Sequence, residues 1–364
     1  MTGVAIIGVG AVTPVGLSVR ASCVALQSGI ARLGPLPGYL VDDERGVGEP
    51  VTGGRVPLEW FDGGPEKLEW PGHEYFKVEI PPQFHLLIED GPQRLVDLAV
   101  PAALEAWSAT GYAHPPSATC GLFLGLDEAD KPDLLVREIA QALRWTPGIT
   151  EVIRAGRSAG FAALQHAVAA INAGHITTAI VGGVDSLIRP LACKALQSIG
   201  MLKCVDAPDG IIPGEAAAFL VIEAGSPGRS LARLLGLGLH DEPTAGTDKP
   251  NAGLGLTRAI RATGVGHLAE WPSIICDLTG DRYRGLEWAL VRDRALGSLT
   301  WSERSGDLWH AADAIGDSGA ASGILSIVWA VDALTHGYSR TDHILVWGAS
   351  DRTLRAAAVI AKVD

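Results

Sequence analysis

The chain has 364 residues, 47% hydrophobic and 19% charged, so it is long enough to bury a large core in two domains or one doubled domain. Its net charge of −12 argues against a basic surface for nucleic acid or for an anionic membrane. It has no apolar run of about eighteen residues, as a membrane-spanning helix requires. The five cysteines are scattered without a C-x-x-C pair, which predicts a cytoplasmic protein without disulfides, metal or cofactor.

The N-terminal stretch predicts a strand, a turn and a helix. Residues 4–8 form a short apolar run, residues 8–16 are rich in glycine, and residues 18–27 have helical character. A dinucleotide-binding loop would run from its glycines directly into a helix, whereas here Thr13 and Pro14 intervene. We therefore expect no dinucleotide site in this turn.

Residues 33–91 have no clean periodicity and are rich in proline, glycine, tryptophan and acidic residues. We interpret them as a surface insertion with short strands that covers one face and is able to bind a partner. After it, residues 93–107 predict a helix that Pro101 should kink or split. Residues 120–125 predict a buried strand.

Residues 154–186 predict a tight turn, a helix of small residues and a buried strand. Gly156 and Gly160 bracket the turn, where a side chain would block close backbone approach. Apolar residues spaced by four and three place a stripe on one helix face, and Gly174 ends the helix. The following strand ends in the pair Gly182 and Gly183.

The second part of the chain repeats this alternation of strands and helices. The run ILVWGAS at residues 344–350, interpreted as the final strand and its turn, is similar to IVGGVDS at residues 180–186. The other elements expected there are a strand from 232, a helix over 253–262, a strand over 273–276 and helices from about 285 and over 319–334.

The chain resembles the β-ketoacyl synthases, condensing enzymes of the thiolase superfamily, over nearly its whole length apart from the insertion. The resemblance implies the thiolase fold, in which two related α/β halves stack as five layers, α-β-α-β-α. The halves would be residues 1–228, containing the insertion at about 33–91, and residues 229–364. The motifs that carry it are GVGAVTPVG at 8–16, the turn, helix and strand of 154–186, DGIIPGEAAAFLVIE at 209–223, and GAASG at 319–323.

The residues at the family's catalytic positions differ from those the reaction needs. Members of the family use a cysteine thiolate at the helix turn and two histidines that stabilise the enolate and move protons. With the glycines of 154–186 aligned, the nucleophile position falls on Arg157, which cannot attack a thioester. In the first histidine loop, Asp277 or Thr279 stands near the missing imidazole. In the second loop, the histidine position is Gly316 and the lysine position is Ala311.

A different chemistry is the alternative hypothesis. Residues 156–160, GRSAG, fit the G-x-S-x-G pattern of a nucleophile elbow. Ser158 would then form an acyl-enzyme from an acyl thioester or ester if a base lay nearby. His310, which we expect in a loop six residues before Gly316, is a better candidate base than His166, which is more typical of a packed helix residue.

Arg157 itself requires a partner if it is buried, because an unpaired buried guanidinium costs several kcal/mol. We expect an ion pair with Asp317, with Asp277 or with both; exposure to solvent or a channel, or binding of an anionic ligand, are the alternatives. Ser318 lies in the same loop as Asp317 and is a further site candidate. For Glu215 we favour a structural role, with its carboxylate held by backbone amides in a tight turn.

The resemblance therefore implies a synthase-like protein without its catalytic residues. It predicts a dimerising partner or adaptor, either similar to the chain-length factors of fatty acid or polyketide synthesis or a scaffold for another protein. Family members pair through the strand before the nucleophile turn, here around residues 151–155, which implies a homodimer or a heterodimer with an active synthase. Acyl-carrier protein and a secretion-effector protein are further candidate partners, and neither nucleic acid nor a membrane is expected.

Overall fold

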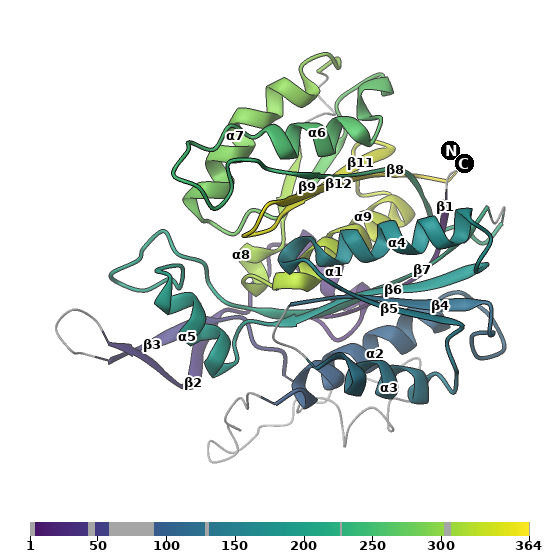
Figure 1. The fold of residues 1–364 in the computed structure, drawn as a ribbon, viewed down its shortest axis with the longest axis horizontal. Helices are drawn as coiled ribbons and strands as arrows, with labels where there is room; N and C mark the ends of the chain where they lie inside the picture. Colours follow the sequence, from purple (N-terminus) through teal and green to yellow (C-terminus); the bar gives the residue numbers. More distant parts are fainter. Residues whose placement is uncertain are drawn as a thin grey trace.

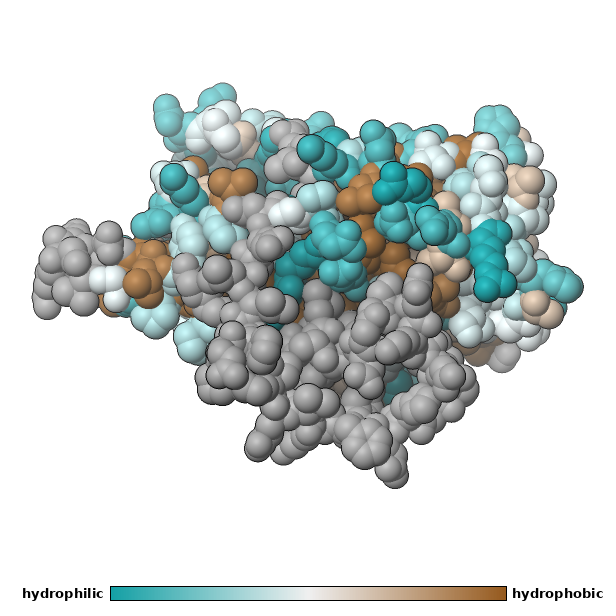
Figure 2. Space-filling model, turned by 90° about the horizontal axis from the view of Figure 1, so that it is seen from below, coloured by the Kyte–Doolittle hydropathy of each residue, from teal (hydrophilic) through white to brown (hydrophobic). Residues whose placement is uncertain are grey.

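The computed structural model describes residues 4–42, 48–57, 91–127, 131–225, 228–301 and 307–363. Among these residues, no helix has both the length and the apolar character needed to cross a membrane. On the face seen in Figure 2, hydrophilic side chains alternate with smaller hydrophobic areas.

The strands and helices of the described chain alternate along most of its length (Figure 1). The strands are β1 Val4–Val12, β2 Gly34–Asp42, β3 Gly48–Gly53, β4 Cys120–Leu126, β5 Ile149–Arg154, β6 Thr178–Ser186, β7 Glu215–Ala224, β8 Ala232–Asp241, β9 Ser273–Cys276, β10 Leu308–His310, β11 His343–Ala349 and β12 Leu354–Ala361. The α-helices are α1 Val19–Gln27, α2 Gln93–Ser108, α3 Pro132–Ala142, α4 Ala159–Asn172, α5 Pro190–Ser198, α6 Leu254–Ala262, α7 Arg282–Leu296, α8 Ala312–Ile315 and α9 Ser322–His336. Short 3-10 turns are η4 Gly156–Ser158, η5 Val265–His267 and η6 Gly319–Ala321.

The main sheet has two halves of matching design. Its hydrogen-bonded order is β10-β9-β11-β12-β8-β1-β7-β6-β4-β5, and the halves join where residues 4–6 of β1 pair with residues 232–234 of β8. Counted outward from this junction, each half has two antiparallel pairings followed by two parallel ones. Strand β6 therefore occupies in one half the place that β11 occupies in the other, as the similarity of their sequences predicted.

Figure 1 shows the two half-sheets stacked in five layers. Helices α6 and α7 form one outer layer, α2 and α3 form the other, and α4 and α9 lie between the half-sheets. This mixed α/β arrangement confirms the predicted five-layer fold. The predicted domain boundary between residues 228 and 229 falls between β7 and β8, and it stays a prediction.

Helix α9 of the central layer is buried on all sides because it lies between two sheets, whereas α4 exposes Gln165 and His166. Every residue of α9 from Ser322 to Leu334 is buried, and α4 buries most of its small residues. A helix that is hydrophobic around its whole circumference fits only such an interior position. The two helices thereby bring their N-terminal turns, η4 and η6, into contact at one end of the layer.

Several boundaries differ from the sequence prediction. Strand β1 continues to Val12, so much of the predicted glycine-rich turn is strand. Helix α2 runs without interruption through Pro101, and the predicted split is therefore wrong. Strands β10 and β12 were not predicted; β12 follows the strand that was expected to be the last, and His310 ends β10 rather than lying in a loop.

The predicted insertion contains the two-stranded antiparallel sheet β2-β3, as expected. Its residues 58–90 lie outside the described residues. Figure 1 shows β2, β3 and α5 together at one side of the molecule, away from the half-sheets. Leu36, Val41 and Val51 of this sheet share a small apolar core with Cys193 and Leu196 of α5.

Candidate functional site

Arg157 lies in the turn η4 that leads from the edge strand β5 into helix α4. Gly156 begins the turn with a positive φ of 55°, a backbone conformation that favours glycine. The turn places Arg157 in the interior, where only 3% of the residue is exposed. A cation at this end of a helix is opposed by the helix dipole as well as by burial, so it needs nearby carboxylates.

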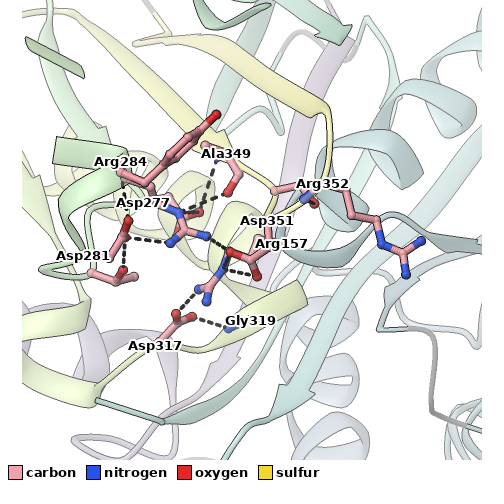
Figure 3. A network of polar contacts seen from close by, with 12 residues as sticks. Arg157, Asp277, Asp281, Arg284, Asp317, Gly319, Ala349, Asp351 and Arg352 are labelled. Carbon is pink, nitrogen blue, oxygen red and sulfur yellow. Dashed lines mark hydrogen bonds and ion pairs between the residues drawn. The ribbon is translucent and has the colours of Figure 1, made fainter. Parts of the chain in front are cut away.

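Two carboxylates from separate loops provide this pairing (Figure 3). Arg157 Nη1 forms an ion pair with Asp317 Oδ2, and Arg157 Nε lies 3.1 Å from Asp351 Oδ2. Asp317 is held in turn, since its Oδ1 accepts a hydrogen bond of 2.9 Å from the Gly319 amide. The predicted ion pair between Arg157 and Asp317 is thus present, whereas Asp351 was not predicted.

A second buried arginine extends the network. Arg284 of α7 pairs with Asp351 through Nη2 and with Asp281 through Nη1 at 2.7 Å. Its Nε donates to the Ala349 carbonyl at 3.2 Å and lies 4.0 Å from Asp277 Oδ2. Figure 3 shows these side chains converging from α7 and from the loops after β9 and β11. Asp277, predicted as a direct partner of Arg157, therefore has its ion pair with Arg284.

Burial and neighbouring charges shift the pKa values of this network in different directions. Burial raises the pKa of Asp277 to about 7, although Arg284 and Arg157 act to lower it. Burial also disfavours ionised Asp351, but Arg157 and Arg284 outweigh it and lower the pKa of this carboxyl to about 2. Burial disfavours the charged form of Arg157, yet Asp317, Asp351 and Asp277 raise its pKa well above the ordinary value. The arginine stays charged, and Asp277 titrates near neutral pH.

The positions of the predicted histidine loops line one small cavity, which Arg157 does not line although its partner Asp317 does. The volume of this cavity is about 10 Å³, which is room for roughly one water molecule. A typical ligand pocket has a volume of about 300–1,000 Å³. The cavity is lined by residues of the two predicted histidine loops and of α9: Cys276, Asp277, Leu278, Thr279, Ala311, Ala312, Gly316, Asp317, Ser318, Ser322, Leu325 and Ser326.

Arg355 holds the turn that carries Asp351. Its guanidinium is fully buried and pairs with Glu287 through Nε at 2.8 Å. Its Nη1 donates to the carbonyls of Ser350 and Arg352 at 2.9 and 2.8 Å. These bonds fix the turn between β11 and β12, and thereby the position of Asp351 beside Arg157.

The structure shows no contact between Ser158 and the histidines proposed as its base in the alternative hypothesis, among the hydrogen bonds of the described residues. Ser158 is buried, and its hydroxyl donates to the Leu354 carbonyl at 3.2 Å. His166 Nδ1 lies 2.7 Å from Glu151, with both side chains largely exposed. His310 Nδ1 lies 3.3 Å from Asp313. No hydrogen bond described in the structure links Ser158 to either imidazole, and its reactivity stays a hypothesis.

Glu215 was expected to have a structural role with its carboxylate held by backbone amides; its partners differ from that expectation, and the role stays a prediction. Its fully buried carboxylate pairs with Arg94, whose Nε lies 2.7 Å from Oε2. The Ser186 hydroxyl and the Val56 amide each donate to it at 2.7 Å. The carboxylate thus ties β7 to β6, α2 and the chain after β3, with a single backbone amide among these contacts.

Sequence reasoning missed Asp351 and Arg284. Asp351 directly follows the run ILVWGAS at residues 344–350, whose similarity to residues 180–186 was the available signal for a turn there. Arg284 carries no motif, because its role depends only on α7 packing beside that turn. Among the described residues, no three histidine, cysteine, aspartate or glutamate side chains are arranged to hold a metal ion.

Comparison with known sequences gives two matches. Residues 138–227 match the family model described as "Beta-ketoacyl synthase, N-terminal domain". The chain is 26% identical over 281 residues to the highly reducing polyketide synthase sphB of Aspergillus fumigatus. This match covers 67% of the chain but only 11% of that relative, so the chain spans about a tenth of its length.

Solved structures with the same fold cover the whole chain, each with a TM-score of 0.73. The ketosynthase from module 6 of the bacillaene synthase of Bacillus subtilis 168 is 16% identical and is covered over 72% of its length. The ishigamide ketosynthase/chain length factor is 19% identical, and a type II polyketide synthase ketosynthase in complex with its acyl-carrier protein is 14% identical, both covered fully. The chain therefore has the thiolase fold of these ketosynthases, and its residues 138–227 resemble the N-terminal domain of the β-ketoacyl synthases.

Proposed function

We propose that this protein is a non-catalytic ketosynthase-fold subunit that pairs with another ketosynthase-fold chain, in the manner of a chain-length factor. The observation that carries the proposal is the closed turn at the N-terminus of α4. Arg157, which the resemblance places at the family's nucleophile position, is ion-paired to Asp317 and Asp351. A guanidinium is not a nucleophile, because its protonated form has no free electron pair to attack a thioester.

The surrounding space supports the same proposal. A condensing enzyme must hold an acyl chain next to its nucleophile and must place an imidazole beside it. Here the cavity beside Asp317 has a volume of about 10 Å³, and Asp277, Thr279 and Gly316 line it where the family's histidine loops would be. Carboxylates paired with arginines stabilise this closed arrangement, and the Ser158 hydroxyl donates to a backbone carbonyl, that of Leu354.

The partner is inferred from the free edge of the sheet and from the related structures. Strand β5 ends the main sheet, and it pairs only with β4 among the described residues. An open edge of this kind can pair with another chain. One related structure is a ketosynthase/chain length factor, and another holds an acyl-carrier protein with its ketosynthase. We therefore propose a homodimer or a heterodimer with an active synthase through residues 151–155.

Acyl loading provides the test. The purified chain would be incubated with acyl-loaded acyl-carrier protein and its intact mass measured, beside a ketosynthase that carries its cysteine. We expect the control to gain an acyl group and this chain to gain none. An acyl adduct that disappears in Ser158→Ala would contradict the proposal and favour the alternative acyltransferase or esterase. Turnover abolished in Arg157→Met, while the variant stays folded, would contradict it as well.

A further inference from the structure

The outer face of α6 and α7 exposes an apolar stripe. Tyr283, Leu286 and Leu290 follow one another on α7 at intervals of three and four residues, which places them on one face of the helix. They are 41%, 50% and 37% exposed, and Leu254 at the start of α6 is 39% exposed. A Cβ built on Gly253 would lie 3.7 Å from Leu290 Cβ, so the start of α6 adjoins the stripe.

Arginines outnumber acids among the exposed residues of α6 and α7. The exposed charged residues within the two helices are five arginines, Arg258, Arg261, Arg282, Arg292 and Arg294, and one acid, Asp293. The local excess is therefore four positive charges, in a chain whose net charge is −12. Arg284 and Glu287 of α7 point inward and are buried, so they do not change this balance.

The face is held rigid by bonds that cross it. Arg261 Nη2 donates to the Arg294 carbonyl at 2.7 Å, and Arg294 Nη1 donates to the Ala252 carbonyl at 2.7 Å. Tyr283 is fixed from below, because its hydroxyl accepts a hydrogen bond of 3.2 Å from buried Arg355. A rigid aromatic residue among apolar neighbours loses little side-chain entropy when it is covered, which favours binding.

We propose that the outer face of α6 and α7 is a docking surface for an acidic amphipathic helix of a partner protein. The stripe from Tyr283 to Leu290 extends over seven residue steps, or about 10 Å along the helix axis. That length matches about two turns of an amphipathic helix, whose acidic flanks would meet the arginines.

Two other occupants fit the charges less well. A second copy related by a twofold axis would place the same arginines opposite one another, at a cost in repulsion. An anionic membrane would attract the arginines but would repel the remaining surface of a chain with net charge −12. The proposal concerns a face of the molecule separate from Arg157, and it does not depend on the proposed loss of catalysis.

The test uses a synthetic probe. A fluorescent peptide of about fourteen residues would carry leucines at helical spacing on one face and glutamates on the other, and its binding to the full chain would be followed by fluorescence anisotropy. We expect saturable binding that weakens with salt and falls at least about tenfold in Leu286→Ser/Leu290→Ser and in Arg258→Glu/Arg282→Glu. The matched controls, Leu191→Ser/Ile199→Ser on α5 and Arg137→Glu on α3, should bind as the unchanged chain does.

The other results would overturn the proposal. These are no saturable binding, equal binding of a lysine-for-glutamate peptide, or equal losses in the control variants. Binding to phosphatidylserine vesicles with none to the peptide would assign the face to a membrane. A native mass that falls by half in Leu286→Ser/Leu290→Ser would assign it to a second copy. Circular dichroism of each variant would confirm that it is folded.

Discussion

Arg157 joins the two halves of the fold through charge. Its own turn belongs to the first half-sheet, whereas Asp317 and Asp351 lie in loops of the second. Asp351 also has Arg284 as a partner, but Asp317 has its ion pair with Arg157 alone among the ion pairs described. Removal of Arg157 would therefore leave Asp317 as a buried carboxylate without its cation.

We expect Arg157→Met to lower the free energy of unfolding by about 3–5 kcal/mol, as when one partner of a buried ion pair is removed. Urea denaturation followed by circular dichroism would measure it. Arg292→Met, at an exposed pair with Asp293, should change stability by less than about 1 kcal/mol. The double variant Arg157→Met/Asp317→Asn should recover part of the loss, and an Arg157→Met as stable as the unchanged chain would refute the structural role of this pair.

Asp277 gives the network a pH dependence. Its pKa in the folded chain is about 7, raised by burial from an ordinary value of 3.8. A carboxyl with a raised pKa stabilises the fold while it is protonated, and this contribution is lost as pH rises through the folded pKa. Burial likewise raises the pKa of Glu105 to about 7, and this carboxyl acts in the same direction.

We therefore expect the free energy of unfolding to fall between pH 5 and pH 8, by on the order of a few kcal/mol. Asp277→Asn should make this decline shallower, because an amide does not titrate and still accepts the bond from the Ala349 amide. Urea unfolding at several pH values would test it. An equally steep decline in Asp277→Asn would show that Asp277 does not carry the effect.

At the scale of elements, close packing between β4 and the turn into α4 holds Arg157 in place. A Cβ on Gly125 would lie 2.4 Å from the Gly160 nitrogen and 2.5 Å from the Ala159 carbonyl carbon. These are backbone atoms of the first turn of α4, and they cannot move away from a Cβ unless the whole helix moves. Glycine at this position therefore lets the helix begin directly against the strand.

We expect Gly125→Ala to destabilise the chain by at least about 1–3 kcal/mol, as overpacking in a core does. The matched control is Gly285→Ala in α7, where a Cβ would meet no atom within 4 Å. Alanine is the better helix former, so this change should be neutral or stabilising by up to about 1 kcal/mol. Thermal unfolding of both variants would measure these changes in stability. Equal melting temperatures would show that the contact between residue 125 and the first turn of α4 can relax.

At the scale of the whole molecule, β5 is an open edge that ends one half-sheet. Its residues 151–153 are only partly buried in the single chain. Pairing with another chain would cover this edge and continue the sheet across both molecules. The strand leads directly into the turn of Arg157, so an interface there would also support the site.

We expect the chain to be dimeric in light scattering, and Ile153→Lys to shift it toward the monomer, because a charge would then lie at the covered edge. Leu239→Lys places the same charge at a half-buried position of β8, a strand inside the main sheet rather than at its end, where Leu239 pairs with Ala356 of β12. This control should remain dimeric, although it should be less stable. An Ile153→Lys chain with an unchanged dimer mass would exclude β5 as the interface.

The sequence by itself determined most of the fold and several of the residues that line the central cavity. Glycines at tight turns and apolar periodicity report local backbone demands, and these predicted α4 and β6. The five-layer arrangement was implied by the resemblance to the β-ketoacyl synthases. Strand β12 was not predicted because its alanine-rich run, LRAAAVIA, has a weak preference for strand. Strand β10 was not predicted because it has only three residues. The pairing of Arg157 with Asp317 followed from two loops that the family alignment places opposite each other.

Only the tertiary structure decided the remaining partners. Arg157 and Asp351 are 194 positions apart in the chain, and Arg284 and Asp351 are 67 apart. No local pattern encodes such contacts, because they arise when α7 and the β11–β12 turn pack beside the start of α4. The size of the cavity could not be predicted from the sequence either, because it depends on how side chains from three separate segments fill the same space.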